Sequence, residues 1–214
     1  MTEFPCAGDH FRLAPIFILR HRRAMRSTWF ASLLLVGLLI VFRVISAFGL
    51  LPNFSPLPAV FLCSLIFFRK KSAWLLPVVA WMVTDPLVSL IQGYPLIGFQ
   101  HLGILAGLSG CVGLGLWLRR HPSRGAVLGG SLLAAAFFYV ASNSVAFLFD
   151  PLYSKTFHGF VQAQWTGPEG YAPTWLFFRN LAAANFLFTA AFLSALSPAA
   201  RFTNPATLPT ATHS

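Results

Sequence analysis

The sequence predicts an all-α membrane protein, a bundle of six transmembrane helices with both ends in the cytoplasm. Apolar residues make up 57% of the 214-residue chain, and charged residues only 9%. This composition leaves too few polar side chains to cover a water-exposed surface, and the apolar residues gather in long runs that suit lipid. Basic residues lie in short clusters between these runs. We therefore place most of the chain within a bilayer.

Six apolar segments are candidates for the helices. A helix of about 20 residues crosses the ~30 Å hydrocarbon layer. The second segment, with 14 residues, makes only about 21 Å of helix, so it needs irregular chain before it to reach the surface. The segments are Thr28–Phe48, Ser55–Phe68, Ala73–Gln92, Leu96–Leu118, Gly125–Phe149 and Thr174–Leu196.

The distribution of Lys and Arg predicts the orientation. Counted on alternate sides of the six segments, twelve lie on one side and only Lys155 on the other. Short basic loops stay in the cytoplasm, so we expect a multi-pass protein of the inner (plasma) membrane with both termini cytoplasmic. The twelve are Arg12, Arg20, Arg22, Arg23, Arg26, Arg69, Lys70, Lys71, Arg119, Arg120, Arg124 and Arg201.

Three regions follow from this topology. Residues 1–27 form a basic cytoplasmic tail, residues 28–196 the transmembrane domain, and residues 197–214, rich in Thr, Pro and Ala, a disordered cytoplasmic tail. The Arg-rich N-terminal stretch has no convincing cleavage site, which favours a tail over a removable signal. Met25 is an alternative start to Met1.

The formal charge of +10 follows from these basic clusters. They lack the interleaved aromatic and polar residues of a nucleic-acid groove, so we expect no nucleic-acid partner. The three cysteines have no metal-ligand spacing, and we predict neither a metal nor a cofactor.

Several polar side chains fall at one depth in the predicted spans. By helical rise from the outer ends, Arg43, Asp85 and Asn143 lie about 8 to 10 Å down. Buried polar groups in a membrane are costly and often functional, so this layer predicts a watery cavity open to the outside. The alternative is a structural Arg43–Asp85 pair. Near the same depth are Gln100, His101, Arg179 and Asn180.

The segment Pro52–Pro56 predicts a buried helix start. Ser55 is a suitable N-cap and Pro56 suits the first helical position. Free N–H groups there would favour a carboxylate or phosphate, although a plain tight turn is the alternative. Asp85-Pro86 predicts either a break that Asp85 caps or an ordinary proline kink.

One long outer connection, Asp150–Pro173, carries several aromatic residues. Long loops in compact domains are often lids or binding loops, and these aromatics favour a lid or interfacial packing over disorder. Soluble-enzyme motifs such as GxSxG, a Walker loop and HExxH are missing, so we predict no catalysis. The alternative is an intramembrane enzyme that uses Asp85 and His101.

A resemblance to a known family is carried by the stretch Pro52-Asn53-Phe54-Ser55-Pro56-Leu57-Pro58-Ala59, followed by Thr84-Asp85 and Ser142-Asn143. Further agreement comes from Tyr153, Lys155-Thr156, Gly159 and the run Phe177–Asn180. From Arg43 to Leu196 the chain resembles an uncharacterised bacterial family of transport-like proteins. Those proteins are similar to the substrate-binding S components of energy-coupling-factor (ECF) transporters.

The resemblance implies six helices, cytoplasmic ends, a ligand site near the outer face, and a lid made by the first or the fifth loop. The chain departs from the family at Ala184 and Asn185, where an acidic residue is usual.

We therefore predict a noncatalytic transport or substrate-binding subunit that captures a small anionic or zwitterionic solute from outside. Its other partners would be the lipid bilayer, a membrane coupling subunit and separate ATPases. A noncatalytic scaffold or complex-assembly subunit is the rival hypothesis. The candidate solute-binding residues are Arg43, Asn53, Ser55, Asp85, His101, Asn143, Tyr153, Arg179 and Asn180.

Overall fold

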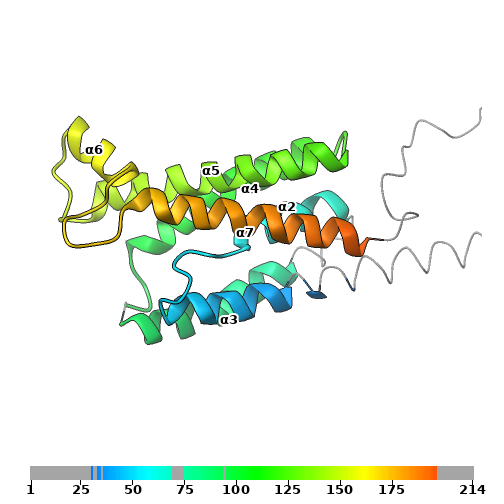
Figure 1. Cartoon of the computed structure of the whole chain (residues 1–214), viewed down its shortest axis with the longest axis horizontal. Helices are drawn as coiled ribbons and strands as arrows, with labels where there is room; N and C mark the ends of the chain where they lie inside the picture. The colour runs from blue at the N-terminus through cyan, green and yellow to red at the C-terminus, as the bar shows by residue number, and fades with distance from the viewer. Residues whose placement is uncertain (1–29, 31–32, 35, 69–74, 94, 197–214) are drawn as a thin grey trace, which may run out of the picture.

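The computed structural model describes residues 30, 33–34, 36–68, 75–93 and 95–196, and every regular element within them is helical (Figure 1). The predicted tails at residues 1–27 and 197–214, and the start of the first segment, lie outside these residues. The helices are the segment Val36–Ala47, α2 (Leu57–Phe67), α3 (Leu75–Gln92), α4 (Phe99–Leu118), α5 (Arg124–Phe149), α6 (Phe157–Gln164) and α7 (Thr174–Ala195).

The long helices have the length and surface of membrane spans. Within the described residues, three helices are long and apolar enough to cross a bilayer: α4, α5 and α7. Their outward side chains are apolar, as at Trp117, Leu133 and Leu187, which are 66%, 61% and 56% exposed. Such faces suit lipid and not water. The shorter apolar helices are Val36–Ala47, Leu57–Phe67 and Pro77–Gln92.

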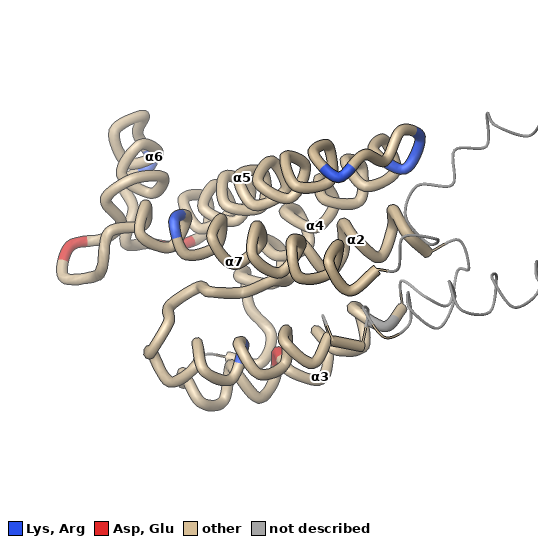
Figure 2. Tube along the Cα trace, turned by 45° about the vertical axis from the view of Figure 1, so that its right-hand side comes forward, with Lys and Arg blue, Asp and Glu red and all other residues tan. Residues whose placement is uncertain are grey.

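The segment Val36–Ala47 and α3 lie side by side along one edge of the bundle made by α2, α4, α5 and α7 (Figures 1 and 2). The short helix α6 lies at one end, which we call the α6 end. The opposite end is basic: Arg119 and Arg120 follow α4, and Arg124 begins α5. In Figure 2 this end carries the blue segments at the start of α5.

Helix α2 forms the centre of the core. Its residues are apolar all round, and all but Leu65 and Phe67 are buried. A helix that is apolar on every face is stable only when it is covered on every face. Aromatic contacts reinforce the packing around it: the Phe42 ring lies 5.1 Å from that of Phe188, and Phe67 lies 5.3 Å from Phe192.

Helix α3 runs unbroken through Pro86. The hypothesis that Asp85 caps a second half-helix is therefore wrong, and Pro86 is a proline inside one continuous helix. Proline removes one backbone hydrogen bond and crowds the preceding turn. The carbonyl that loses its N–H partner is that of Met82, four residues before Pro86, whereas the buried Thr84 hydroxyl donates to the Ala80 carbonyl at 2.8 Å. Asp85 is thus presented on a helix face and not at a helix end.

Glycines on α4 allow close contact with α5. A Cβ placed on Gly103 would lie 3.2 Å from the Ser142 Cα, and one on Gly107 would lie 3.0 Å from the Phe138 Cα. The two glycines are four residues apart and so share one helix face. Small residues at this spacing let membrane helices approach closely and gain van der Waals contact. Because α4 also carries His101, this contact helps to position the polar groups described below.

We expect Gly107→Leu to lower the melting temperature in detergent, because the new side chain must displace Phe138 and the α5 backbone. Overpacking of this kind costs about 1–3 kcal/mol. The matched control is Gly113→Leu on the same helix, where an added Cβ meets no heavy atom within 4 Å. Equal melting temperatures for the two variants would argue against the close α4–α5 contact.

Candidate functional site

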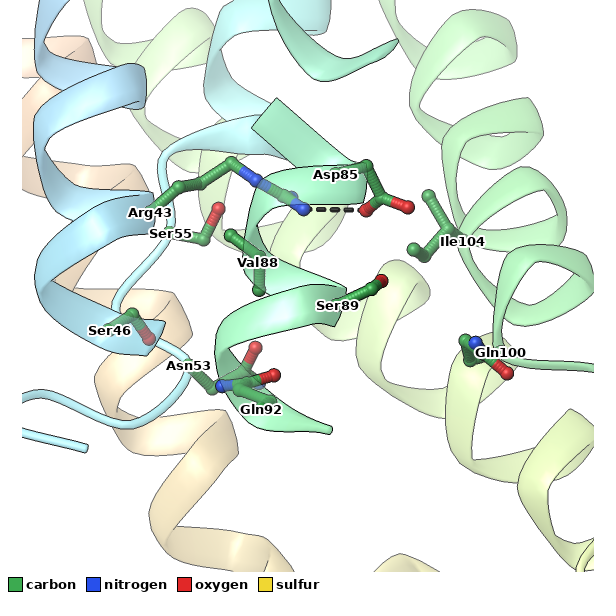
Figure 3. A pocket seen from close by; sticks show the side chains of 10 residues that line it. All are labelled: Arg43, Ser46, Asn53, Ser55, Asp85, Val88, Ser89, Gln92, Gln100 and Ile104. Atoms are coloured by element: carbon green, nitrogen blue, oxygen red, sulfur yellow. Dashed lines mark hydrogen bonds and ion pairs between the residues drawn. The ribbon is translucent and has the colours of Figure 1, made fainter. Parts of the chain in front are cut away.

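Asp85 is the centre of a polar cluster that joins three helices. Its Oδ1 accepts a hydrogen bond from Arg43 Nη2 at 2.6 Å and another from Trp81 Nε1 at 3.1 Å. Its Oδ2 lies 2.8 Å from His101 Nε2. Arg43 comes from the segment Val36–Ala47, Asp85 from α3 and His101 from α4. The carboxylate thus connects α3 to both neighbours, and Figure 3 shows its contact with Arg43.

The His101 ring directs the same N–H toward Asp85 in either of two protonation states. Its Nδ1 lies 3.2 Å from the Gly98 N and 3.1 Å from the Gly98 O. A neutral ring can accept from Gly98 N–H, and a charged ring can donate to the Gly98 carbonyl. In both cases Nε2 carries hydrogen and donates to Asp85, because a carboxylate offers only acceptors.

A partly open cavity of about 250 Å³ lies beside this cluster (Figure 3). Its walls come from the segment Val36–Ala47, the turn at Asn53–Ser55, α3 and the start of α4. Uncharged polar side chains predominate, with two apolar ones. The lining residues are Arg43, Ser46, Asn53, Ser55, Asp85, Val88, Ser89, Gln92, Gln100 and Ile104.

The turn before α2 has a conformation that suits its sequence. Asn53 has φ of 57°, a left-handed geometry that asparagine tolerates better than most residues. The Phe54 N–H donates to the Leu51 carbonyl at 3.1 Å, and the Ser55 N–H donates to the Asn53 carbonyl at 2.9 Å. These local bonds satisfy backbone groups that lie away from water. They also place Asn53 and Ser55 on the cavity wall.

Two asparagines of α7 hold this turn. Asn180 Nδ2 donates to the Pro52 carbonyl at 3.0 Å. Asn185, fully buried, donates to the Ser55 carbonyl at 3.3 Å and accepts from the Ala59 N–H at 2.6 Å. At 1.5 Å per residue, Asn185 lies about 16 Å along α7 from Thr174. The start of α2 therefore lies deep in the bundle, as its short length predicted.

The N-terminus of α2 is not free to bind an anion. Pro56, not Ser55, is the N-cap residue. The Leu57 N–H makes a long contact of 3.4 Å with Ser55 Oγ, and Asn185 takes the Ala59 N–H. Pro58 has no N–H to offer. The prediction that free N–H groups await a carboxylate or phosphate is therefore wrong, because side chains of this chain already satisfy them.

The predicted polar layer is only partly one site. Asn143 is half-buried on α5 and does not line the cavity. Arg179 is exposed, with its guanidinium 5.8 Å from the Trp175 ring and 3.3 Å from Asn180 Oδ1. Asn180 acts on the turn and not on the cavity. Four of the nine candidates line the cavity, namely Arg43, Asn53, Ser55 and Asp85, and His101 contacts Asp85.

The long connection between α5 and α7 is ordered and packs on those two helices. It contains α6, whose first turn is capped by Thr156 Oγ1 accepting from the Gly159 N–H at 3.1 Å. Tyr139 on α5 donates to the Gln164 carbonyl, and Lys155 donates to the Asp150 carbonyl at 2.8 Å. These bonds hold the connection against α5, and the loop that lines the cavity is the turn at Asn53–Ser55.

Tyr153, also a candidate, is buried within this connection. Burial, together with the nearby Asp150, raises the pKa of its phenol. It therefore stays protonated at neutral pH and packs in the loop, away from the residues that line the cavity.

Several cavity residues escaped the sequence interpretation, although helical spacing points to them. Ser89 and Gln92 lie four and seven residues after Asp85, and Ser46 lies three after Arg43. Residues at these spacings share a helix face. Trp81, four residues before Asp85, follows the same rule. Asn185 had no such signal, because its partners are 126 and 130 residues away.

The comparisons identify a family. The model of the family of unknown function DUF6580 matches residues 23–207. The chain belongs to this family. No curated protein and no solved structure matches the chain. Within the described part of this DUF6580 chain, no group of three His, Cys, Asp or Glu side chains is placed to hold a metal ion.

We expect Asn185→Ala to destabilise the protein strongly. The substitution leaves the Ala59 N–H and the Ser55 carbonyl without partners in the core, at about 1–3 kcal/mol for each buried group. Asn180→Ala is the matched control, since it removes the bond to Pro52 and the contact with the exposed Arg179 from a half-buried side chain on the same helix. Thermal melts in detergent should show the larger loss for Asn185. The reverse order would contradict the role assigned to it.

A double-mutant cycle should reveal the coupling between Arg43 and Asp85. Asp85→Asn alone leaves a buried guanidinium unpaired, at a cost of about 3–5 kcal/mol. Arg43→Gln alone should cost less, because His101 and Trp81 still donate to Asp85. The double variant should be more stable than the sum of the single losses predicts. Additive losses in chemical denaturation would show that the two groups do not stabilise each other.

Proposed function

We propose that this protein is a membrane-embedded subunit that binds a small solute for transport. The cavity beside Asp85 carries this proposal. Polar side chains inside an apolar bundle cost free energy and are usually retained for function. Here they come from two helices, a buried turn and α4, and they surround space that other atoms of the described chain leave empty. Small-molecule sites are typically concave, with a few convergent polar groups.

The proposed orientation places the cavity toward the outside of the cell. The cavity includes Gln100 at the start of α4, whereas Arg119 and Arg120 follow the end of that helix. Basic loops favour the cytoplasmic side. With six spans and cytoplasmic termini, a solute would enter from the α6 end. The plasma (inner) membrane is the location that this proposal requires.

The resemblance to S components of ECF transporters supports a division of labour. In the proposed assembly this chain captures the solute, and a membrane coupling subunit with ATPases supplies energy. The sequence contains no Walker motif, which is consistent with energy from separate subunits. In this proposal the chain itself carries out no catalysis.

One observation favours a second candidate, a noncatalytic scaffold. Arg43 and His101 both contact Asp85, as they would in a purely structural cluster. A purely structural cluster does not explain the adjoining cavity. We therefore prefer solute binding to the scaffold hypothesis. An intramembrane enzyme is less well supported, because both oxygens of Asp85 already accept hydrogen bonds.

Filling the cavity tests the proposal. Ser89 lines the cavity and is buried, so Ser89→Phe should occupy the space that a solute needs. We expect this variant to fold but to lose uptake, or to lose the rise in melting temperature that solutes cause in the wild type. The matched control is Leu90→Phe, on the same turn of α3 but 67% exposed.

The scaffold hypothesis predicts the opposite result. If no solute in a broad polar screen stabilises the wild type, and a stoichiometric protein partner copurifies with both variants, solute binding is the wrong function. Loss of uptake in Leu90→Phe as well as in Ser89→Phe would likewise remove the cavity from the mechanism.

A further inference from the structure

We infer that the solute is electroneutral, small and rich in hydrogen-bonding groups. This inference rests on the proposed function and names the class of molecule that the cavity would accept. It departs from an expectation based on the sequence, in which Arg43 and a free helix terminus attract an anion.

The charges around the cavity cancel. Arg43 Nη2 and Asp85 Oδ1 are 2.6 Å apart, and their side chains are only 11% and 12% exposed. In the described residues that surround the cavity, from 36 to 67, 75 to 93 and 99 to 118, His101 is the only acidic or basic side chain besides this pair. With a neutral imidazole the net charge is zero. A charged solute would therefore lack a counter-ion in a poorly hydrated site, which is costly.

Two features could attract an anion, the Arg43 charge and the N–H groups that begin α2, and both already have partners within the chain. The Arg43 guanidinium faces Asp85, and an anion would have to separate this pair before it gained full contact. The N–H groups that begin α2 are engaged by Ser55 and Asn185. The Arg43 charge is therefore already balanced by Asp85, so the described residues offer an anion no net positive charge. Arg43 Nε has no hydrogen-bond partner among these residues and can donate to an uncharged acceptor of the solute.

Apart from Val88 and Ile104, the remaining lining residues are uncharged donors and acceptors. Hydroxyl and amide side chains both donate and accept, so they match a solute with several hydroxyl or amide groups, or one whose own charges balance. None of the described lining residues is aromatic, so these residues offer a flat ring system no stacking partner. These uncharged polar residues are Ser46, Asn53, Ser55, Ser89, Gln92 and Gln100.

The volume limits the size of the solute. About 250 Å³ holds roughly eight water molecules at ~30 Å³ each. Cavities for drug-sized ligands usually measure about 300–1,000 Å³. A short polyol, a small amide or a compact zwitterion fits within this space, whereas a larger solute would extend out through its open side.

Matched solute sets test the inference. The purified protein in nanodiscs is melted at pH 8 with neutral and charged members of each set. One set is glucitol, gluconate and glucamine, and another is glutamine, glutamate and lysine. We expect the neutral or zwitterionic member of at least one set to bind at least about tenfold more tightly than its charged counterparts.

Variants that add one charge at the rim sharpen the test without breaking the ion pair. Gln92 lines the cavity and is exposed, so both Gln92→Lys and Gln92→Glu should fold. The lysine variant should shift selectivity toward the anionic member, and the glutamate variant toward the cationic member, each by several-fold. The same substitutions at Gln164, on α6 and away from the cavity lining, are the control and should leave selectivity unchanged.

The outcomes separate the two proposals. If a charged member binds the wild type more tightly than its neutral counterpart, and Ser89→Phe abolishes that binding, the electroneutral class is wrong while solute binding stands. If no small polar solute binds and Ser89→Phe leaves uptake intact, both proposals fail. Both proposals are supported if the wild type prefers the neutral solute, if Ser89→Phe abolishes binding of that solute, and if the charged Gln92 variants shift the selectivity as expected.

Discussion

The geometry of the site depends on a single carboxylate inside an apolar bundle. Asp85 accepts hydrogen bonds from Arg43 and Trp81, and the His101 ring directs an N–H toward it. An isolated charge at this depth would cost several kcal/mol, since lipid and packed side chains cannot replace water. The carboxylate is stable there because three donors surround it. Each donor is thereby held in one orientation, and the three helices are held at fixed distances.

The same constraint governs the irregular backbone beside the cluster. The chain from Leu51 to Pro56 leaves the α6 end and enters the bundle before α2 begins. Backbone groups at that depth need partners from the protein. Local turns supply some of them, and the amide of Asn185 supplies both an acceptor and a donor across the core. An amide suits this place, because it offers both kinds of group without a charge.

These two solutions together explain why there is a cavity at all. The turn brings Asn53 and Ser55 to mid-depth, where a regular helix would have placed a continuous wall. The Asp85 cluster holds α3 against the start of α4 through side chains. The space between them is lined by polar groups whose own bonds are mostly local, so they can exchange water for a solute. Satisfied charges and uncharged walls make this an unusual place for an ion and a suitable one for a neutral polar molecule.

The sequence alone determined five of the described helices, but not α6, which lies in the connection predicted as a loop. Apolar runs bounded by basic clusters and turn residues predicted the ends of α2, α3, α4, α5 and α7 to within three residues. This succeeded because in a membrane every backbone group must bond within its own segment, so run length dictates the element. Depth was also predictable, since each residue adds about 1.5 Å along the axis. The sequence therefore identified Arg43 and Asp85 as residues at a similar depth in the bundle.

Only the tertiary structure decided which polar groups meet. Asn143 is at the predicted height but is not part of the cavity lining, and Arg179 turns to Trp175. The rotation of each helix about its axis and its choice of neighbours are set by packing, such as the contact of Gly107 with Phe138. Likewise, no local pattern could predict that Asn185 would satisfy α2, because that bond joins residues 126 positions apart. Periodicity describes one helix at a time, whereas a site is a property of several helices packed together.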